Sequence, residues 1–141
     1  MSETDALARR VADTLLAREG TGPAWGVVIE EAREGYARIR MAVRADMLNG
    51  HALAHGGIIF ALADTAFAYA CNSRNVSTVA QNASISFLAT AKLGDVLVAE
   101  AIEASLAGRS GVYRVGIRTA DGKVIAEFTG LSRSIGGTVI N

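Results

Sequence analysis

One carboxylate stands alone in the most apolar segment of the chain. Asp64 is the only charged residue in 58–71, where most side chains are apolar. Burying a charge is costly unless the group is paired or performs chemistry. Gly56 and Gly57 precede this segment and should open a helix with unpaired N–H groups at its positive end. An N–H group that polarises a carbonyl and a carboxylate that acts as base or nucleophile are parts of a hydrolytic site.

The spacing between these parts argues against one helix serving one carbonyl. Asp64 follows Gly56 by 64 − 56 = 8 residues. In a helix this is roughly 12 Å along the axis, at about 1.5 Å per residue. The spacing therefore favours a site shared by two copies of the chain, in which Asp64 of one copy serves a carbonyl held by the other.

Each candidate residue also has a structural interpretation. Asp64 would be a core carboxylate satisfied by hydrogen bonds, and Asn49 a turn residue in front of Gly50. His55 would be a loop residue that positions the start of the helix. His51 and His55 are four residues apart, like a zinc-binding pair, but the glutamate of a metalloprotease is missing between them. No metal or other cofactor is expected.

Apolar periodicity predicts the elements that must position these residues. An N-terminal helix is expected at about 4–19, stopped by 20–23, and a second helix at about 56–72. Apolar residues surround the second helix, so it should be buried nearly all round. The tail at 136–138 should be loose. Strands are expected at about 25–31, 36–43, 77–88, 96–106, 112–119 and 124–134.

Short links between the late strands predict an antiparallel sheet. One long apolar helix needs a partner surface, and a sheet curved around it supplies one. The predicted fold class is therefore α+β, as a single domain over residues 1–141. Pairing with a second copy across a two-fold axis would cover the exposed sheet edges, so we expect a dimer.

Composition narrows the possible functions. Of the 141 residues, 50% are hydrophobic, and 14 Lys and Arg balance 14 Asp and Glu. A balanced charge gives no reason to expect a nucleic-acid partner. The apolar runs are too short to span a membrane and the N-terminus does not resemble a signal peptide, so a cytoplasmic protein without a membrane partner is expected.

Several segments carry a resemblance to a known family. They are 49–51 (Asn-Gly-His), 55–57 (His-Gly-Gly) and 62–72, with supporting matches at 86–88, 92–95, 111–113 and 134–138. Together they resemble the hotdog-fold acyl-CoA thioesterases of the phenylacetic-acid-degradation (PaaI) type. The resemblance implies a hotdog fold, in which a curved antiparallel sheet wraps a long central helix. It also implies hydrolysis of acyl-CoA thioesters, such as phenylacetyl-CoA or hydroxyphenylacetyl-CoA, by a homotetramer built as a dimer of dimers.

The same resemblance implies roles for individual residues. Asn49 would help to hold the thioester or the attacking water, and His55 opens the His-Gly-Gly element. The Gly56 N–H would bind the thioester carbonyl, and Asp64 would act as general base or nucleophile across the dimer. Ala52 departs from the family pattern, because many relatives have a glycine there.

Substrate binding requires groups of two kinds. Coenzyme A carries phosphates, so cationic side chains and N–H groups should line the mouth of the cleft, although these charges could equally be solvated. The acyl group should meet apolar side chains. The candidate substrate-binding residues are Gly57, Phe60, Arg109, Ser110, Lys92 and Arg133, with Ala61 and Phe67 as further candidates for the acyl pocket.

Three other functions remain open. The chain could be a non-catalytic hotdog module that binds acyl-CoA, a broad-specificity medium-chain acyl-CoA thioesterase, or a hotdog dehydratase. Release of free thiol distinguishes hydrolysis from binding and from dehydration. Comparable rates on all acyl groups would favour a broad thioesterase.

Overall fold

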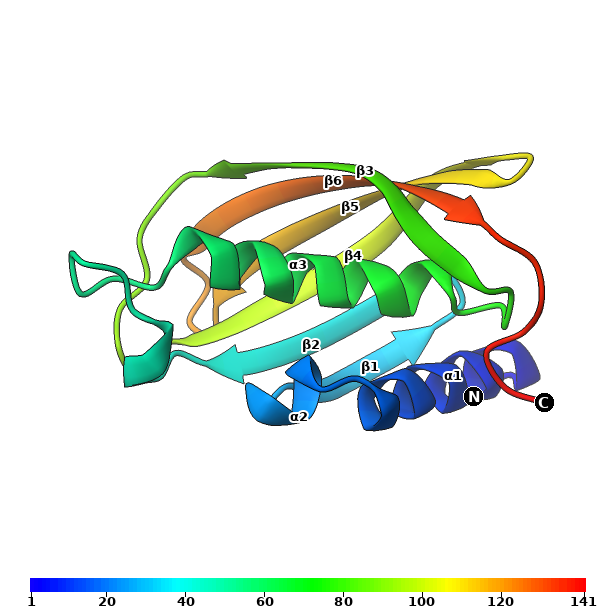
Figure 1. Cartoon of the computed structure of the whole chain (residues 1–141), viewed down its shortest axis with the longest axis horizontal. Helices are drawn as coiled ribbons and strands as arrows, with labels where there is room; N and C mark the ends of the chain where they lie inside the picture. The colour runs from blue at the N-terminus through cyan, green and yellow to red at the C-terminus, as the bar shows by residue number, and fades with distance from the viewer.

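A six-stranded antiparallel sheet curves around one long helix in the computed structural model, which describes residues 1–141 (Figure 1). The strand order is β1-β2-β4-β5-β6-β3, so β1 and β3 form the two edges. The predicted α+β architecture is confirmed. The strands are β1 (Val28–Arg33), β2 (Tyr36–Ala42), β3 (Thr78–Phe87), β4 (Val96–Ala107), β5 (Ser110–Thr119) and β6 (Val124–Ser134). The helices are α1 (Glu3–Arg18), α2 (Thr21–Ala24), the 3₁₀ helix η1 (Ala45–Met47) and α3 (Gly56–Cys71).

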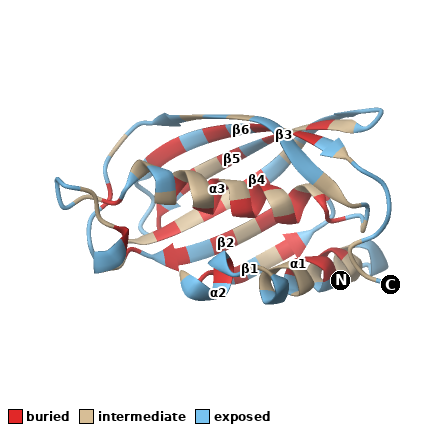
Figure 2. Cartoon of the chain, in the orientation of Figure 1, coloured by how far each residue is buried: buried red, intermediate tan, exposed pale blue.

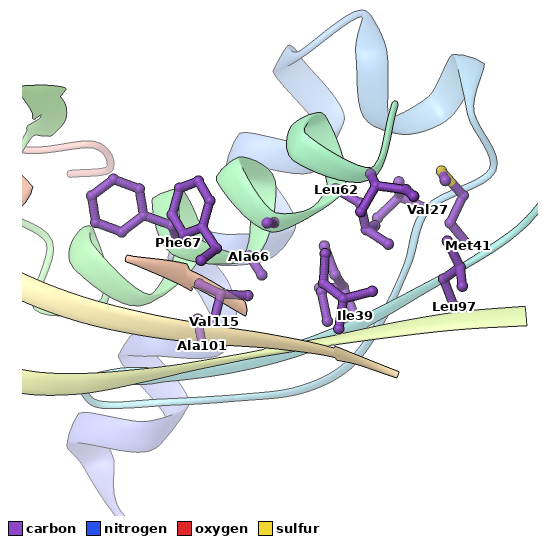
Figure 3. Packing of buried hydrophobic residues seen from close by; sticks show 14 of the residues in the cluster. Val27, Ile39, Met41, Leu62, Ala66, Phe67, Leu97, Ala101 and Val115 are labelled. Atoms are coloured by element: carbon purple, nitrogen blue, oxygen red, sulfur yellow. The ribbon is translucent and has the colours of Figure 1, made fainter. Parts of the chain in front are cut away.

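The core lies between α3 and the concave face of the sheet. Side chains alternate between the two faces of a strand, so the apolar half of each strand points at the helix. On β2, Ala37, Ile39 and Met41 are buried in this way. Figure 3 shows Leu62 and Phe67 of α3 packed against the apolar side chains of the strands. Burying one such side chain contributes about 1.5–3 kcal/mol, which holds α3 lengthwise along the sheet.

A glycine in β6 lets α3 come close to the sheet. A Cβ added at Gly130 would lie 2.8 Å from the ring of Phe67. The ring of Phe67 also packs against Tyr113 and Phe128, at centroid distances of 5.5 and 5.8 Å. Only a residue without a side chain fits beneath Phe67, and this fixes the position of the last turns of the helix.

Side chains fix both ends of α3. The Nδ1 atom of His55 accepts a hydrogen bond from the N–H of Gly57 at 2.8 Å, which makes His55 the N-cap. At the other end, Nδ2 of Asn72 donates to the carbonyls of Ala68 and Thr78 at 2.9 and 3.0 Å. Its Oδ1 accepts the N–H of Thr78 at 2.9 Å, so one side chain joins the helix end to the start of β3.

The segment 20–23 does more than stop the first helix. After α1 ends, the chain forms the short helix α2, which the sequence analysis missed. Pro23 is compatible with this turn because the first residues of a helix need no intrahelical N–H donor. The strand expected from residue 25 begins only at Val28, after Gly26 with φ +69°.

The prediction of a loose tail at 136–138 is wrong. The N–H of Ser77 donates to the carbonyl of Gly137 at 3.0 Å. The Oδ1 atom of Asn75 accepts from the N–H groups of Val139 and Ile140, both at 2.9 Å. These hydrogen bonds satisfy backbone groups of the tail and hold it against the segment that follows α3.

The prediction that α3 is buried nearly all round fails for one stripe. The stripe runs along one helix face, because its residues are four and three apart. Its members are exposed or half-buried: Gly57, Ala61, Asp64, Ala68 and Cys71. Much of α3 that faces the viewer in Figure 2 is half-buried, and the neighbouring edge strand β3 is largely exposed. The sheet covers only the opposite side of the helix. None of the helices has the length and apolar character that crossing a membrane requires.

Candidate functional site

Asp64 lines a cavity of about 390 Å³ between the end of α1, the half-covered stripe of α3 and the start of β3. This volume is within the range of small-molecule sites, about 300–1,000 Å³. The lining residues are Leu15, Arg18, Glu19, Asp64, Phe67, Ala68, Tyr69, Cys71, Asn72, Thr78, Val79 and Ala80. The cavity therefore combines apolar walls with a few polar groups, as a binding site for a mainly apolar ligand would.

The Asp64 carboxylate is not satisfied by the protein around it. Burial raises the pKa of Asp64 above its ordinary value, and no hydrogen bond or neighbouring cation counteracts that shift. A structural core carboxylate would have such partners. Burial, and then the nearby Asp64 charge, raise the pKa of Cys71 to about 12. The cysteine is thus a neutral thiol at physiological pH and a poor nucleophile.

The start of α3 offers one free N–H group instead of two. His55 occupies the N–H of Gly57, so the expectation of two unpaired groups is wrong for Gly57. The N–H of Gly56 donates no hydrogen bond within the chain. A Cβ added at Gly56 would lie 3.2 Å from the ring of Phe87, so the ring of Phe87 packs directly over this glycine. The helix dipole and the free N–H of Gly56 make this point suitable for a carbonyl oxygen that gains negative charge.

The loop before α3 is shaped by the side chain of Asn49. Its Oδ1 accepts from the N–H groups of His51 and Leu53 at 2.9 and 3.1 Å. This is the turn chemistry of the structural interpretation, but it uses only the oxygen, and the Nδ2 group remains available as a donor. Ala52 has φ +60°, a left-handed conformation that favours glycine, which explains why glycine suits this position.

One chain does not bring the candidate catalytic residues together. Asn49, His55 and Gly56 are all absent from the lining of the Asp64 cavity. His55 and Gly56 lie at the start of α3 and Asn49 in the loop before it, whereas Asp64 lies in the third turn of the helix. The chain therefore carries its candidate catalytic residues in two separate groups at the start and in the middle of α3, which we call half-sites.

Three of the substrate-binding candidates lie at the hairpin between β4 and β5. Ser110 pairs with Arg133 across the β5–β6 ladder, and the carbonyl of Arg109 accepts the N–H of Ser134. Arg109 and Ser110 line a second cavity of about 120 Å³, which shares Cys71 and Thr78 with the Asp64 cavity. Arg109 and Ser110 are thus placed next to the Asp64 cavity, whereas Arg133 lines neither cavity.

Two of the other candidates, Lys92 and Phe60, also lie away from the Asp64 cavity. Lys92 forms a β-bridge with Leu53, in the β3–β4 connection at the end of the molecule opposite the β4–β5 hairpin (Figure 1). The expected cations therefore do not form one cluster in a protomer. Phe60 does not line the Asp64 cavity, because its ring packs edge-on against Phe128 at 5.4 Å, whereas Phe67 does line it.

The contribution of α1 to this cavity was not predicted from the sequence. Leu15, Arg18 and Glu19 line it from the end of the first helix. No local pattern in the sequence could have identified them. Their position depends on how α1 docks against α3, which is a contact between segments about 50 residues apart, as in the hydrogen bond between Glu19 and Tyr69.

Known proteins resemble this chain in sequence and in structure. The profile of the Thioesterase superfamily matches residues 51–126, a segment that contains Gly56 and Asp64. The acyl-coenzyme A thioesterase PaaI of Escherichia coli K12 is 42% identical over 128 residues, which are 91% of each chain. The structure of the E. coli PaaI protein from the phenylacetic acid degradation operon matches with a TM-score of 0.94 at 40% identity, over 96% of this chain and 99% of that one. A hypothetical thioesterase from Streptococcus pneumoniae, solved with coenzyme A, matches with a TM-score of 0.77 at 27% identity, over 79% of this chain and 90% of that one.

Proposed function

The chain belongs to the thioesterase superfamily, and from this premise we propose that it hydrolyses acyl-coenzyme A thioesters. The most specific form of the proposal is an aryl-acyl ester such as phenylacetyl-CoA or hydroxyphenylacetyl-CoA. Its relative PaaI of E. coli is an acyl-coenzyme A thioesterase, and the S. pneumoniae relative was solved with coenzyme A. Both relatives support a coenzyme A ester as the substrate.

One observation carries the proposal: the unpaired, half-buried carboxylate of Asp64 in a ligand-sized cavity. A carboxylate in this position lowers folding stability, because burial disfavours its charged form and nothing compensates. A general base works best when its pKa lies closer to the working pH than that of a free carboxylate. The raised pKa of Asp64 is thus useful to catalysis although it is unfavourable for the fold.

The half-sites suggest the following reaction. The Gly56 N–H of one protomer binds the thioester carbonyl oxygen, and Asn49 Nδ2 orients the ester or the attacking water. In one route, Asp64 of the partner subunit takes a proton from that water, whose oxygen bonds the carbonyl carbon; the C–S bond then breaks, and the proton passes from Asp64 to the departing thiolate. In the other route, the Asp64 carboxylate attacks the carbon itself and the C–S bond breaks; water then hydrolyses the resulting mixed anhydride, which regenerates Asp64 and supplies the proton of the thiol. Both routes give the free acid and the thiol of coenzyme A. Losing one donor to the developing oxyanion typically lowers the rate by about 10²–10³-fold.

The surface of the protomer supports a shared site. The half-covered stripe of α3 lies beside the edge strand β3, whose side chains Val79 and Phe87 are 47% and 51% exposed. Pairing two β3 edges about a two-fold axis would cover both surfaces. Ile102 and Leu106 of β4 are also exposed and offer a second apolar contact. We accordingly propose a cytoplasmic homotetramer, a dimer of dimers, with Arg109, Ser110 and Arg133 near the coenzyme A phosphates.

A thiol-release assay tests this function. The purified protein should release coenzyme A from phenylacetyl-CoA and hydroxyphenylacetyl-CoA faster than from benzoyl, short-chain or medium-chain esters. Asp64→Ala should lower turnover by about 10²–10⁴-fold, as expected for loss of a general base. The matched control is Asp46→Ala, which removes an exposed loop carboxylate that pairs with Arg44.

Three other outcomes would contradict the mechanism, the aryl preference or the hydrolytic function. Near wild-type turnover in a folded Asp64→Ala protein would contradict the mechanism. Equal rates on all esters would replace the aryl preference by a broad specificity. Tight binding of acyl-CoA without thiol release would identify a non-catalytic binding module.

A further inference from the structure

We infer that Glu19, at the C-terminal end of α1, determines acyl-group specificity by accepting a hydrogen bond from the far end of the acyl group in the Asp64 cavity. The inference rests on the proposed thioesterase activity and adds a residue that takes no part in the proposed reaction steps. Glu19 lines the same cavity as Asp64 but belongs to a different helix. The two carboxyl groups therefore approach one cavity from separate elements.

Most polar atoms in the cavity already have partners. Asn72 uses its Nδ2 and its Oδ1 to join α3 to β3. The Thr78 hydroxyl donates to the carbonyl of Val76 at 2.8 Å, and the Tyr69 hydroxyl donates to Oε1 of Glu19. Arg18 is exposed, and its Nη1 donates to a carbonyl of the C-terminal tail. The carboxyl oxygens without a partner in the chain are those of Asp64 and the second carboxyl oxygen of Glu19.

The Glu19 carboxyl is held in a fixed position. Tyr69, which holds Oε1, is itself only 1% exposed. A Cβ added at the buried Gly22 would lie 2.6 Å from the same Oε1, so the carboxyl group packs closely over this glycine. The backbone N–H of Glu19 donates to the carbonyl of Leu15 at 3.0 Å. Burial also raises the pKa of Glu19. A rigid acceptor of this kind loses little entropy when it binds a donor.

The chemistry of the lining selects one class of acyl group. With the thioester at Asp64, the chain of the acyl group would run along apolar walls that include Phe67, Val79 and Ala80. Its far end would then meet Glu19. A hydroxyl there can donate to the carboxylate in a strong, charge-assisted bond, whereas an acyl group that ends in a carboxylate would be repelled. A phenolic acyl ester is the simplest probe with these properties.

The test compares two esters that differ by one hydroxyl group. We define the discrimination ratio as kcat/KM for 4-hydroxyphenylacetyl-CoA divided by kcat/KM for phenylacetyl-CoA. The wild-type ratio should exceed one. In Glu19→Gln the side chain can still accept from Tyr69, but it presents an amide donor to the cavity in place of an acceptor. The ratio should therefore fall about 10-fold, the effect expected for one hydrogen bond to a charged group.

Two further variants keep the test decisive. Glu3→Gln makes the same change in the first turn of α1, outside the cavity, and should leave the ratio unchanged. Tyr69→Phe keeps the buried ring but frees the Glu19 carboxyl, so it should lower the ratio by a smaller factor. A wild-type ratio near one, or an unchanged ratio in folded Glu19→Gln, would overturn the inference while leaving the thioesterase function intact. A wild-type protein that hydrolyses neither ester would overturn the proposed function, and the inference with it.

Discussion

At the scale of single residues, the strongest signal is a carboxylate placed where it lowers stability. Asp64 is half-buried, it has no hydrogen-bond partner, and burial alone raises its pKa. Such destabilising groups are common at sites of proton transfer, because the reaction requires the shifted pKa. Replacing Asp64 by a neutral residue should therefore raise the stability of the fold and lower the catalytic activity.

The Asp64 pKa gives a pH-dependent prediction for stability. The folded protein binds this proton more tightly than the unfolded chain, whose value is near 3.8. Stability is thus lost as the pH rises from that value through the raised folded pKa. Asp64→Asn removes the penalty and should raise the Tm at pH 7, with the gain disappearing below the ordinary aspartate value. Thermal unfolding across pH checks this, with Asp46→Asn as the exposed control. A lower Tm for Asp64→Asn at pH 7 would contradict the assignment.

Ala52 allows a second prediction at the residue scale. Its φ of +60° is unfavourable for a residue with a side chain. Ala52→Gly relieves the strain of the left-handed backbone conformation, which is roughly 1–2 kcal/mol. The greater freedom of glycine in the unfolded chain offsets part of this, so the free energy of unfolding should rise by about 0.5–1 kcal/mol. Urea unfolding measures this change. Ala120→Gly, at a turn position without positive φ, should instead destabilise by about 0.4–1 kcal/mol. Equal effects at both positions would exclude the strain.

At the scale of elements, the start of α3 joins a cap to a binding group. His55 holds the N–H of Gly57, and its own N–H donates to the carbonyl of Met47 at 2.8 Å. These bonds fix the first turn and leave the N–H of Gly56 directed away from the helix ladder. The geometry gives His55 a positioning role, which is the structural interpretation of this residue.

Two substitutions at residue 55 separate capping from chemistry. His55→Ala should destabilise the protein by about 1 kcal/mol, because the Gly57 N–H loses its acceptor, and it should also lower kcat. His55→Asn supplies a capping oxygen and should restore most of the stability and most of kcat. Denaturant unfolding and the thiol-release assay measure the two effects. If the asparagine variant regains stability but not turnover, the imidazole takes part in the reaction itself.

At the scale of the whole molecule, the two groups of residues required by the proposed reaction are separated within one chain. The free N–H of Gly56 and the cavity of Asp64 lie at different turns of α3. The exposed edge of β3 and the half-covered stripe lie on the same side as the cavity. A two-fold dimer would place the Gly56 half of one protomer against the Asp64 half of the other. In the proposed function, dimer formation is therefore required for activity.

Complementation between inactive variants tests the shared site. Asp64→Ala and Asn49→Ala should each be nearly inactive alone. Mixed dimers of the two contain one intact site out of two, and they form half of a random mixture, so co-refolded protein should regain about a quarter of wild-type activity. Separately refolded proteins that are mixed without exchange are the control. No recovery in verified mixed dimers would place the whole site within one protomer.

Much of the fold and of the candidate site is encoded locally. The period-two pattern of β2 defines which side chains face the core, and the helical pattern after the glycines places α3 correctly. The position of Asp64 within an apolar helix was visible for the same reason.

Contacts between distant segments were decided by the tertiary structure alone. The docking of α1 brings Glu19 into the cavity that Asp64 lines, and only the folded backbone shows that His55 occupies the Gly57 N–H while Gly56 stays free. The same holds for the separation of Lys92 from Arg109. Sequence patterns report the period and the ends of each element, because these depend on neighbouring residues. Which elements meet depends on how their apolar surfaces fill one common volume, and no single segment contains that information.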